Sequence, residues 1–370
     1  MKKAKFLTGF IVFSLLPLLT RAALAAPSAQ KITSETGIAY GTIVIDEASG
    51  GIKSSDIGNA WEIMAPMPEG RVFNAVIANG AYIYVIGGTS DPIGNSPTST
   101  NFRYNTLDNT WQTMTPMPVA LDSIDGAVIN GKIYIPGVTD DNNTYVYDIA
   151  TDSWTNIPAN GDYEAAQQYQ VVAIDTDLYV LGGLVSGSST TAVWKLDTIT
   201  QTWSGGIPMQ NSRTSFSAIA INGEIYVAGG VSYPGFNPDM TAEKFDGTAW
   251  SYIAPLPDGG EAYTRWSYMA DGNTDGRMWL AAGRRDASWG VLNHAAYYDP
   301  TSDVWTDSPT IPVLNQGRVY VEGDVASDGY FYVIGGRDPS ASTVYDTNER
   351  LKVVTPDITI EFLYLPLVLN

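Results

Sequence analysis

The chain has 370 residues, a formal net charge of -19 and no cysteine. The acidic excess argues against nucleic acid as a partner, because phosphate binding needs clustered lysine and arginine. The lack of cysteine excludes disulfides, thiolate nucleophiles and Cys-ligated metals, so the stability of the fold must come from packing.

The first 25 residues have the composition of a secretory signal peptide. Three lysines precede an apolar run over residues 6–19, and Ala23 and Ala25 form an A-x-A cleavage pattern. We expect cleavage near Ala25, with Ala26 as the neighbouring site, and a mature protein that is secreted, periplasmic or on the cell surface. A retained membrane anchor is the alternative. Cleavage would remove four basic residues and no acidic one, which moves the net charge from -19 to -23.

Residues 26–56 form an N-terminal extension. A strand is expected over residues 38–45, and a Gly- and Ser-rich linker follows it. No stretch after the signal peptide is long enough to span a bilayer.

Two signals then recur every 43 to 55 residues, which indicates one structural unit copied along the chain. The first is an aromatic residue three positions before a glycine or alanine that ends an apolar strand. These aromatic residues are Tyr84, Tyr134, Tyr179, Tyr226, Trp279 and Tyr332. The second is a tryptophan that follows a turn, at Trp61, Trp111, Trp154, Trp203, Trp250 and Trp305.

Each unit predicts four short antiparallel strands. An apolar strand such as residues 73–78 leads into a tight turn such as Asn79-Gly80, and the second strand ends in glycine. A variable loop follows, then a third strand ending near residues such as Tyr104, and the tryptophan opens the fourth strand. A proline marks the exit to the next unit, because proline cannot continue a central strand.

These motifs resemble the kelch repeat, whose pattern is an apolar strand, a Gly-Gly pair, a tyrosine and a tryptophan about six residues later. The resemblance covers roughly residues 57–353. Four units carry the full Gly-Gly pair, and two carry the degenerate forms Gly137-Val138 and Ala282-Gly283. The resemblance implies an all-β fold, a six-bladed β-propeller over residues 57–354 with four antiparallel strands per blade.

The phase of the two signals predicts how the ring closes. Trp61 precedes the first Tyr-to-Gly strand, whereas the last such strand is followed by no tryptophan. Alignment of Glu349-Arg350-Leu351 with Glu243-Lys244-Phe245 makes residues 347–353 the third strand of the last unit. We therefore expect the N-terminal segment around Trp61 to complete the last blade.

Residues 355–370 form an apolar C-terminal tail. The tail is too short to span a membrane. Packing of the tail against the propeller and a role in surface attachment or sorting are both open.

His294 is the only histidine, so any site that needs a histidine would depend on this one residue. A multi-histidine metal site is therefore excluded. Kelch propellers similar to galactose oxidase use a cysteine-linked tyrosine and two histidines with copper, and this chain lacks both. We expect no cofactor.

Four arginines recur 16 or 17 residues before the glycine position of their blades. They are Arg71, Arg213, Arg265 and Arg318. This phase predicts that they point toward the mouth of the central channel, where converging guanidinium groups would suit a carboxylate or a carbohydrate. The alternative is a structural role in which they bind backbone carbonyls and neighbouring carboxylates.

Long loops fall on the same predicted end of the ring. They contain Tyr233, Arg285, Trp289 and His294, and we expect these residues to contribute to ligand binding. The sequence around Asp271, Asn273 and Asp275 fits the opening of a calcium loop, but Ala282 stands at the twelfth position in place of glutamate. An ordinary Asp- and Asn-rich turn is the favoured interpretation.

Three functions remain open at this point. The leading hypothesis is an exported, monomeric binding module for a glycan or protein, of the type found in bacteria, which uses the loop-rich face. In this hypothesis the chain is not an enzyme. The second is a cofactor-independent sugar isomerase or mutarotase resembling the kelch sialic-acid mutarotase. The third is a structural surface scaffold.

Overall fold

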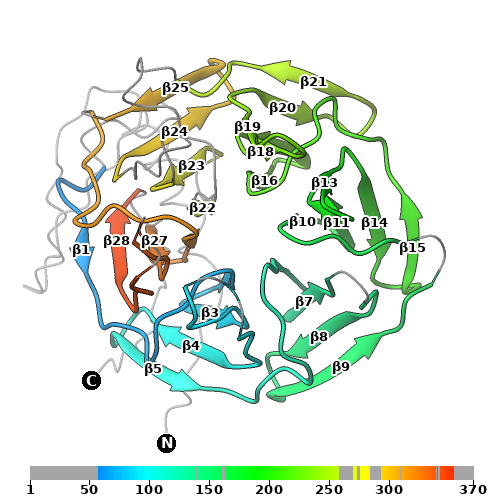
Figure 1. The fold of residues 1–370 in the computed structure, drawn as a ribbon. Helices are drawn as coiled ribbons and strands as arrows, with labels where there is room; N and C mark the ends of the chain where they lie inside the picture. The colour runs from blue at the N-terminus through cyan, green and yellow to red at the C-terminus, as the bar shows by residue number, and fades with distance from the viewer. Residues whose placement is uncertain are drawn as a thin grey trace, which may run out of the picture. The chain divides into compact units, whose positions relative to one another are not determined.

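Six four-stranded antiparallel sheets follow one another around a central channel, each sheet being one blade (Figure 1). The computed structural model describes residues 57–92, 94, 96–138, 141–160, 163–257, 270–272, 276–283, 293–308, 310–338, 340 and 342–353. The signal peptide, the extension over residues 26–56 and the C-terminal tail lie outside these residues and stay predictions. Within the described part of the chain, no helix has the length and apolarity needed to cross a membrane.

The blades are numbered in chain order, with strands running from the channel outward. Blade 1 consists of β2 (Ala75–Asn79), β3 (Tyr82–Ile86), β4 (Asn101–Asn105) and β5 (Thr110–Thr113). Blade 2 consists of β6 (Ala127–Ile129), β7 (Lys132–Pro136), β8 (Thr144–Asp148) and β9 (Ser153–Ile157). Blade 3 consists of β10 (Gln170–Ile174), β11 (Asp177–Leu181), β14 (Val193–Asp197) and β15 (Thr202–Gly205).

The second half of the ring repeats this pattern. Blade 4 consists of β16 (Ser217–Ile221), β17 (Glu224–Ala228), β20 (Ala242–Phe245) and β21 (Trp250–Ile253). Blade 5 consists of β22 (Ala270–Gly272), β23 (Met278–Ala281), β24 (Ala295–Asp299) and β25 (Val304–Asp307). Blade 6 consists of β26 (Glu322–Val325), β27 (Tyr330–Ile334), β28 (Asn348–Lys352) and β1 (Glu62–Ile63).

The N-terminal strand β1 closes the ring, as the sequence predicts. It pairs with β28, with Glu62 opposite Arg350 and Ile63 opposite Glu349, and the pairing is prolonged by backbone bonds from Gly58 to Lys352 and from Met64 to Asn348. Arg350 Nε donates to Glu62 Oε2 at 2.9 Å across the same pair. The two ends of the propeller sequence therefore share one blade.

The recurring tryptophans tie each blade to the one before it. In five blades the indole N–H donates to a backbone carbonyl of the exit segment of the preceding blade, at 2.8–2.9 Å. The pairs are Trp61 to Pro312, Trp111 to Ala65, Trp154 to Thr115, Trp250 to Ile207 and Trp305 to Ala254. Trp61 thus makes in blade 6 the contact that its counterparts make elsewhere.

The paired glycines allow the end of the second strand to approach the next blade. A Cβ on Gly335 would lie 2.6 Å from the carbonyl oxygen of Arg71, and Gly335 has a φ of +73°. Both the space and the backbone conformation therefore require glycine. The adjacent Gly336 N–H donates to the same Arg71 oxygen at 2.8 Å, which links blade 6 to blade 1.

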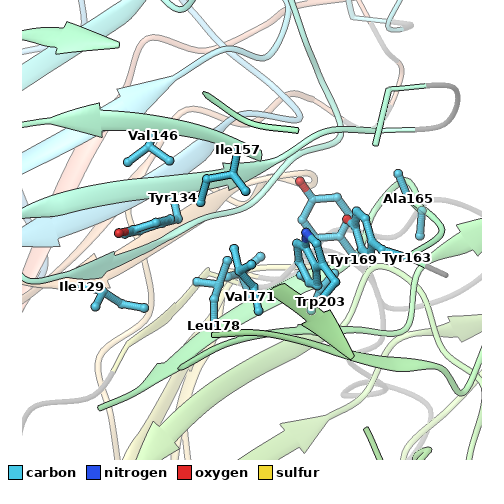
Figure 2. Packing of buried hydrophobic residues seen from close by; sticks show 13 residues of the cluster. Ile129, Tyr134, Val146, Ile157, Tyr163, Ala165, Tyr169, Val171, Leu178 and Trp203 are labelled. Atoms are coloured by element: carbon cyan, nitrogen blue, oxygen red, sulfur yellow. The ribbon is translucent and has the colours of Figure 1, made fainter. Parts of the chain in front are cut away.

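The apolar cores lie between blades. The cluster in Figure 2 joins blade 2, through residues such as Tyr134 and Val146, to blade 3, through residues such as Leu178 and Trp203. Another cluster joins blade 6 to blade 1 through Tyr332 and Tyr104. A blade on its own would leave these faces in water, so the closed ring is the stable unit.

The closure makes a testable prediction. Trp61 is 5% exposed and its ring lies 5.9 Å from that of Phe331. We expect Trp61→Ala to lower the free energy of unfolding by about 3–5 kcal/mol, because it removes a buried aromatic ring and a hydrogen bond between blades. Ile63→Ala on the same strand is the matched control, because Ile63 is 72% exposed. Urea unfolding of both variants measures the difference, and equal stabilities would contradict the closure.

Candidate functional site

The antiparallel connections divide the propeller into two ends. The connections from strand two to strand three of each blade, and those from one blade to the next, lie at one end, which we call the loop end. The short turns from strand one to strand two and from strand three to strand four lie at the other end. The larger connections gather at the loop end, so it is the candidate site.

Four of the blades carry a small three-stranded ladder at the loop end, and we call this set of ladders the crown. Each ladder is formed by the segment entering the blade and by the loop between its second and third strands. The paired residues are Val72, Thr89 and Pro97 in blade 1, Gln167, Leu184 and Ser189 in blade 3, Thr214, Val231 and Pro238 in blade 4, and Val319, Arg337 and Val344 in blade 6.

Two of these ladders touch each other. In blade 3 the loop forms β12 (Leu184–Val185) and β13 (Ser188–Ser189), and in blade 4 it forms β18 (Val231–Ser232) and β19 (Asn237–Pro238). Ser189 N–H donates to the Tyr233 carbonyl at 3.2 Å, and Tyr233 N–H donates to Ser189 Oγ at 2.8 Å. The two hairpins therefore form one wall over blades 3 and 4.

A ring of backbone hydrogen bonds runs from blade to blade where the innermost strands begin. Ser123 N–H donates to Phe73, Gln168 N–H to Ser123, and Ser215 N–H to Gln168, at 2.8, 2.9 and 3.3 Å. All four residues have a positive φ, between 53° and 59°, as does Tyr320 at the same position in blade 6. Non-glycine residues adopt this conformation at a cost, and such residues concentrate at binding sites.

Two of these residues are aromatic and lie together. The rings of Phe73 and Tyr320 are 4.7 Å apart between centroids, and the guanidinium of Arg337 lies 4.7 Å from the centre of the Tyr320 ring. Both aromatic side chains are half-buried. They form an aromatic platform at the boundary of blades 6 and 1.

Below the loop end, the innermost strands enclose a channel with a cavity of about 380 Å³. Most of the residues that line it have apolar side chains, such as Val76, Val171 and Ile219. Among the described residues that line it, Asp125 and Asp324 carry the charge. Asp125 Oδ2 accepts the Val171 N–H at 2.7 Å, and Asp324 Oδ2 accepts the Ala78 N–H at 2.8 Å. Each carboxylate therefore bonds to the backbone of the following blade.

Removal from bulk water raises the pKa of Asp125 and of Asp324 to about 7. Each carboxylate also accepts the N–H of the residue that follows it, at 2.7 Å, and hydrogen bonds of this kind act in the opposite direction on the pKa. The effect of burial is the larger of the two. Both groups therefore titrate in the neutral range.

The predicted arginine ring has a different role from the one its phase suggested. Arg213 and Arg318 are fully buried, and each guanidinium bonds to a fully buried glutamate of its own blade, Glu243 at 2.7 Å and Glu349 at 2.5 Å. Their remaining bonds go largely to backbone carbonyls, such as that of Gly229. The same glutamates accept backbone N–H groups from the loops that precede the arginines, such as that of Asn211.

Arg71 varies the same arrangement. Phe102 stands where Glu243 and Glu349 stand in their blades, and the Arg71 guanidinium lies 5.4 Å from the centre of the Phe102 ring. The charge partner is Glu69, at 2.7 Å, and this contact lowers the pKa of the Glu69 carboxyl. The Arg71 side chain is 1% exposed.

The expectation that these arginines face the channel mouth is therefore wrong for Arg71, Arg213 and Arg318. They do not converge, and the channel cavity is lined by other residues. The physical reason is that a buried guanidinium must be paired, and carboxylates of this chain lie within reach: Glu243 and Glu349 inside their blades, and Glu69 in the segment that enters blade 1. Arg265 lies outside the described residues, and its role in ligand binding stays a prediction.

The other predicted ligand-binding residues are placed only in part. Tyr233 lies at the loop end in the turn of the β18–β19 hairpin, where its ring packs 5.3 Å from that of Phe236. His294 is half-buried in the segment that leads into β24, and its carbonyl accepts the Ala282 N–H. Arg285 and Trp289 lie outside the described residues.

The weak calcium candidate also stays untested. The backbone of Asp271 lies in β22, the first strand of blade 5. Asn273 and Asp275 lie outside the described residues. Among the residues that the structure describes, no group of three or more His, Cys, Asp or Glu side chains could hold a metal ion.

The buried ion pairs predict a specific response to substitution. We expect Arg213→Met to lower the free energy of unfolding by about 3–5 kcal/mol, because it leaves the Glu243 carboxylate buried without its partner. Adding Glu243→Gln should restore part of this loss, because it removes the unpaired charge and its amide oxygen still accepts one of the two backbone N–H groups, of Gln210 and Asn211, that the carboxylate accepts. Lys132→Met, in an exposed pair with Asp148, should cost less than about 1 kcal/mol. A stable Arg213→Met protein would contradict the structural role.

The channel aspartates predict a dependence of stability on pH. The pKa of Asp324 is about 7 in the folded protein and about 3.9 in an unfolded chain, so the folded state binds more protons between these values. Its contribution to stability is therefore lost as the pH rises, by at most about 1.4 kcal/mol per unit. Relative to the unchanged protein, Asp324→Asn should gain stability between pH 5 and pH 8.

Thermal unfolding at several pH values measures this effect. Asp246→Asn is the control, because hydrogen bonds from Thr248 and Ala249 lower the pKa of the Asp246 carboxyl to about 2, which leaves it ionised in both states across this range. A constant difference between Asp324→Asn and the unchanged protein would contradict the raised pKa of Asp324.

Comparison with known proteins relates this geometry to a family. The KLHDC2/KLHL20/DRC7 Kelch-repeats domain matches residues 73–212 and 123–336, which together cover more than half of the chain. The chain is similar to N-(sulfonatooxy)prop-2-enimidothioate sulfolyase of Thlaspi arvense, with 29% identity over 61% of this chain and 73% of that protein. It is also similar to Kelch-like protein terF of Aspergillus terreus, with 25% identity over 72% of this chain and 62% of that protein.

A solved structure agrees with this fold. The structure of YjhT superposes with a TM-score of 0.64 at 14% sequence identity, over 77% of this chain and 95% of that one. The aligned region also covers less than half of other relatives, such as 44% of the Arabidopsis thaliana F-box/kelch-repeat protein At1g22040. Sequence identity at these levels supports a shared architecture. It does not transfer the activity of any relative to this chain. On the matched repeats and the six-bladed ring, the chain belongs to the kelch-repeat family.

Proposed function

We propose that this chain is an exported binding module that holds a protein or glycan ligand at the loop end of its propeller. The observation that carries the proposal is that the arginines at the repeated position have structural roles, whereas aromatic and loop residues lie at the opening of the channel. Arg71, Arg213 and Arg318 are buried and paired with glutamates of this chain, whereas the aromatic platform and the crown loops lie where the channel opens. Binding sites are placed on loops that a rigid scaffold positions, and this end fits that pattern.

The chemistry of the aromatic platform supports a ligand with both apolar and polar surface. An aromatic ring gives a large contact area at little cost in side-chain entropy, and the buried guanidinium of Arg337 supports the Tyr320 ring from within the fold. Phe73, Tyr320 and Arg337 combine these groups at one blade boundary. Kelch propellers generally bind proteins, which supports a protein ligand in particular.

The enzyme alternative is a cofactor-independent sugar isomerase or mutarotase. Acid–base chemistry needs groups that touch the substrate, and the buried side chains of Arg71, Arg213 and Arg318 lack that access. The name of the Thlaspi arvense relative shows that a propeller similar to this one belongs to an enzyme. Anomer interconversion of a sugar in an NMR exchange assay would favour this alternative over the binding module.

Export is part of the proposal and rests on the N-terminal sequence. The basic start, the apolar run and the Ala23-x-Ala25 pattern support it. The intact mass of the protein recovered outside the cytoplasm, starting after Ala25, is the measurement that checks it. A mass that includes residues 1–25 would support the retained anchor.

The binding proposal predicts which side chains affect capture of a ligand. In a glycan array and in a pull-down of proteins from the same organism, we expect Tyr320→Ala to weaken capture by about tenfold, because an anchoring aromatic ring is lost. Tyr252→Ala is the matched control, because Tyr252 is 53% exposed on the outer strand β21. Unfolding measurements on both variants separate a loss of binding from a loss of fold.

Two results would contradict the proposal. One is equal loss of capture in Tyr320→Ala and Tyr252→Ala. The other is capture that depends only on the C-terminal tail, which would favour the surface scaffold.

A further inference from the structure

The crown has a gap over blade 2. The connection between the second and third strands of this blade runs only from residue 137 to 143, and it turns back through a bond from Gly137 N–H to the Asn143 carbonyl at 2.7 Å. The neighbouring blades 1 and 3 both carry a ladder at this level. Within the described residues, blade 2 therefore has no ladder at the level where blades 1 and 3 carry one.

A groove of about 460 Å³ lies between this short connection and the blade 3 hairpin. Its lining comes from three segments: the blade 2 connection, the segment entering blade 3, and the hairpin. The lining residues with polar side chains are Asn142, Glu164, Gln167 and Ser186. A volume of this size is typical of small-molecule sites.

The geometry of the groove is held by the backbone. Asn142 Oδ1 accepts the Ala165 N–H at 3.0 Å, which joins the blade 2 connection to the segment entering blade 3. Gln167 and Leu184 exchange two backbone bonds, at 3.0 and 2.7 Å, which fix the hairpin against the same segment. The polar side chains therefore project from a scaffold that exists before any ligand binds.

The base of this region differs from the other blades. Trp203 does not donate its indole N–H to the preceding blade, as five of its counterparts do; its ring stacks on Tyr163 at 3.8 Å, with the two planes 6° apart. Both side chains are more than nine-tenths buried, and Tyr163 lies next to Ala165, which lines the groove (Figure 2). The stacked pair gives the segment 163–167 a rigid support.

We propose that the groove over blade 2 is a saccharide-binding site for one neutral or amino-sugar unit. The proposal rests on the proposed function and names the ligand class and place of that site. A carboxylate, two amides and a hydroxyl present the mixture of acceptors and donors that sugar hydroxyl groups need. Glu164 is exposed, and within the described residues no cationic side chain pairs with it, so its acceptor capacity is available to a ligand.

Charge excludes the acidic sugars from this groove. Among the described residues that line it, Glu164 is the charged one, and Asp141 lies directly before Asn142. A uronate or another carboxylate-bearing sugar would meet like charge without a compensating cation, whereas an ammonium group would be attracted. The discrimination is therefore between anionic saccharides and all others.

Saturation-transfer NMR on the mature protein tests the site with three monosaccharides that differ in charge. N-acetylglucosamine is neutral, glucosamine is cationic and glucuronate is anionic. We expect saturation transfer to the first two and none to glucuronate. Glu164→Gln should weaken the binding of glucosamine by about tenfold, because one charge-assisted contact is lost, and it should weaken the binding of N-acetylglucosamine by less.

Two further variants sharpen the result. Gln167→Ala should weaken the binding of both glucosamine and N-acetylglucosamine, because it removes a hydrogen-bond donor and acceptor that both sugars would use. Gln201→Ala is the control, because Gln201 is an exposed glutamine in a turn at the opposite end of the propeller. Equal binding of glucuronate, or sugar binding that is unchanged in both Glu164→Gln and Gln167→Ala, would overturn the proposal.

The outcome separates this proposal from the more general one. If no monosaccharide receives saturation while capture still depends on Tyr320, the saccharide groove is refuted and the binding module stands. If sugars bind as expected and Tyr320→Ala changes nothing, the groove is the site and the aromatic platform is not.

Discussion

The structure depends on one constraint: a four-stranded blade has two faces and can bury them only against its neighbours. Three repeated contacts meet this constraint. The glycine N–H at the end of one blade bonds to the next, as Gly336 does with Arg71, the tryptophan indole bonds back to the blade before, and the apolar clusters fill the space between. Because each contact needs a partner on both sides, a ring with a missing strand would leave one set unmade, and β1 supplies it.

The same constraint explains the fate of the arginines. A repeated position at the entrance of a blade is held by its backbone, since the carbonyls of Arg71, Arg213 and Arg318 accept glycine N–H groups from the preceding blades. With the backbone fixed there, a long side chain turns inward and requires a carboxylate, which Glu243 and Glu349 provide. Repetition at one phase is thus evidence of a scaffold, and binding residues are better sought where the repeats differ.

The fold was predictable from the sequence because the pattern of one blade recurs six times. Each Tyr-to-Gly strand and each tryptophan gains support from its copies, and the phase of Trp61 in the sequence is enough to predict the closing strand. The role of the arginines was open, although a signal existed: the alignment of Glu349 with Glu243 places a glutamate in two of the blades that carry the arginine. The groove over blade 2 could not be found in this way, because Asn142, Glu164 and Gln167 belong to segments that do not repeat and meet only in space.

A closed ring of equal blades has no preferred direction across its face, so the position of a ligand must be set by what breaks the symmetry. At the loop end of this chain the described departures are a short connection over blade 2, a joined pair of hairpins over blades 3 and 4, and an aromatic pair between blades 6 and 1. The short connection of blade 2 and the joined hairpins of blades 3 and 4 are adjacent, and the groove lies between them. A ligand that approaches this end meets the joined hairpins on one side and the polar lining of the groove beside them, which is where a propeller of this kind can distinguish one ligand from another.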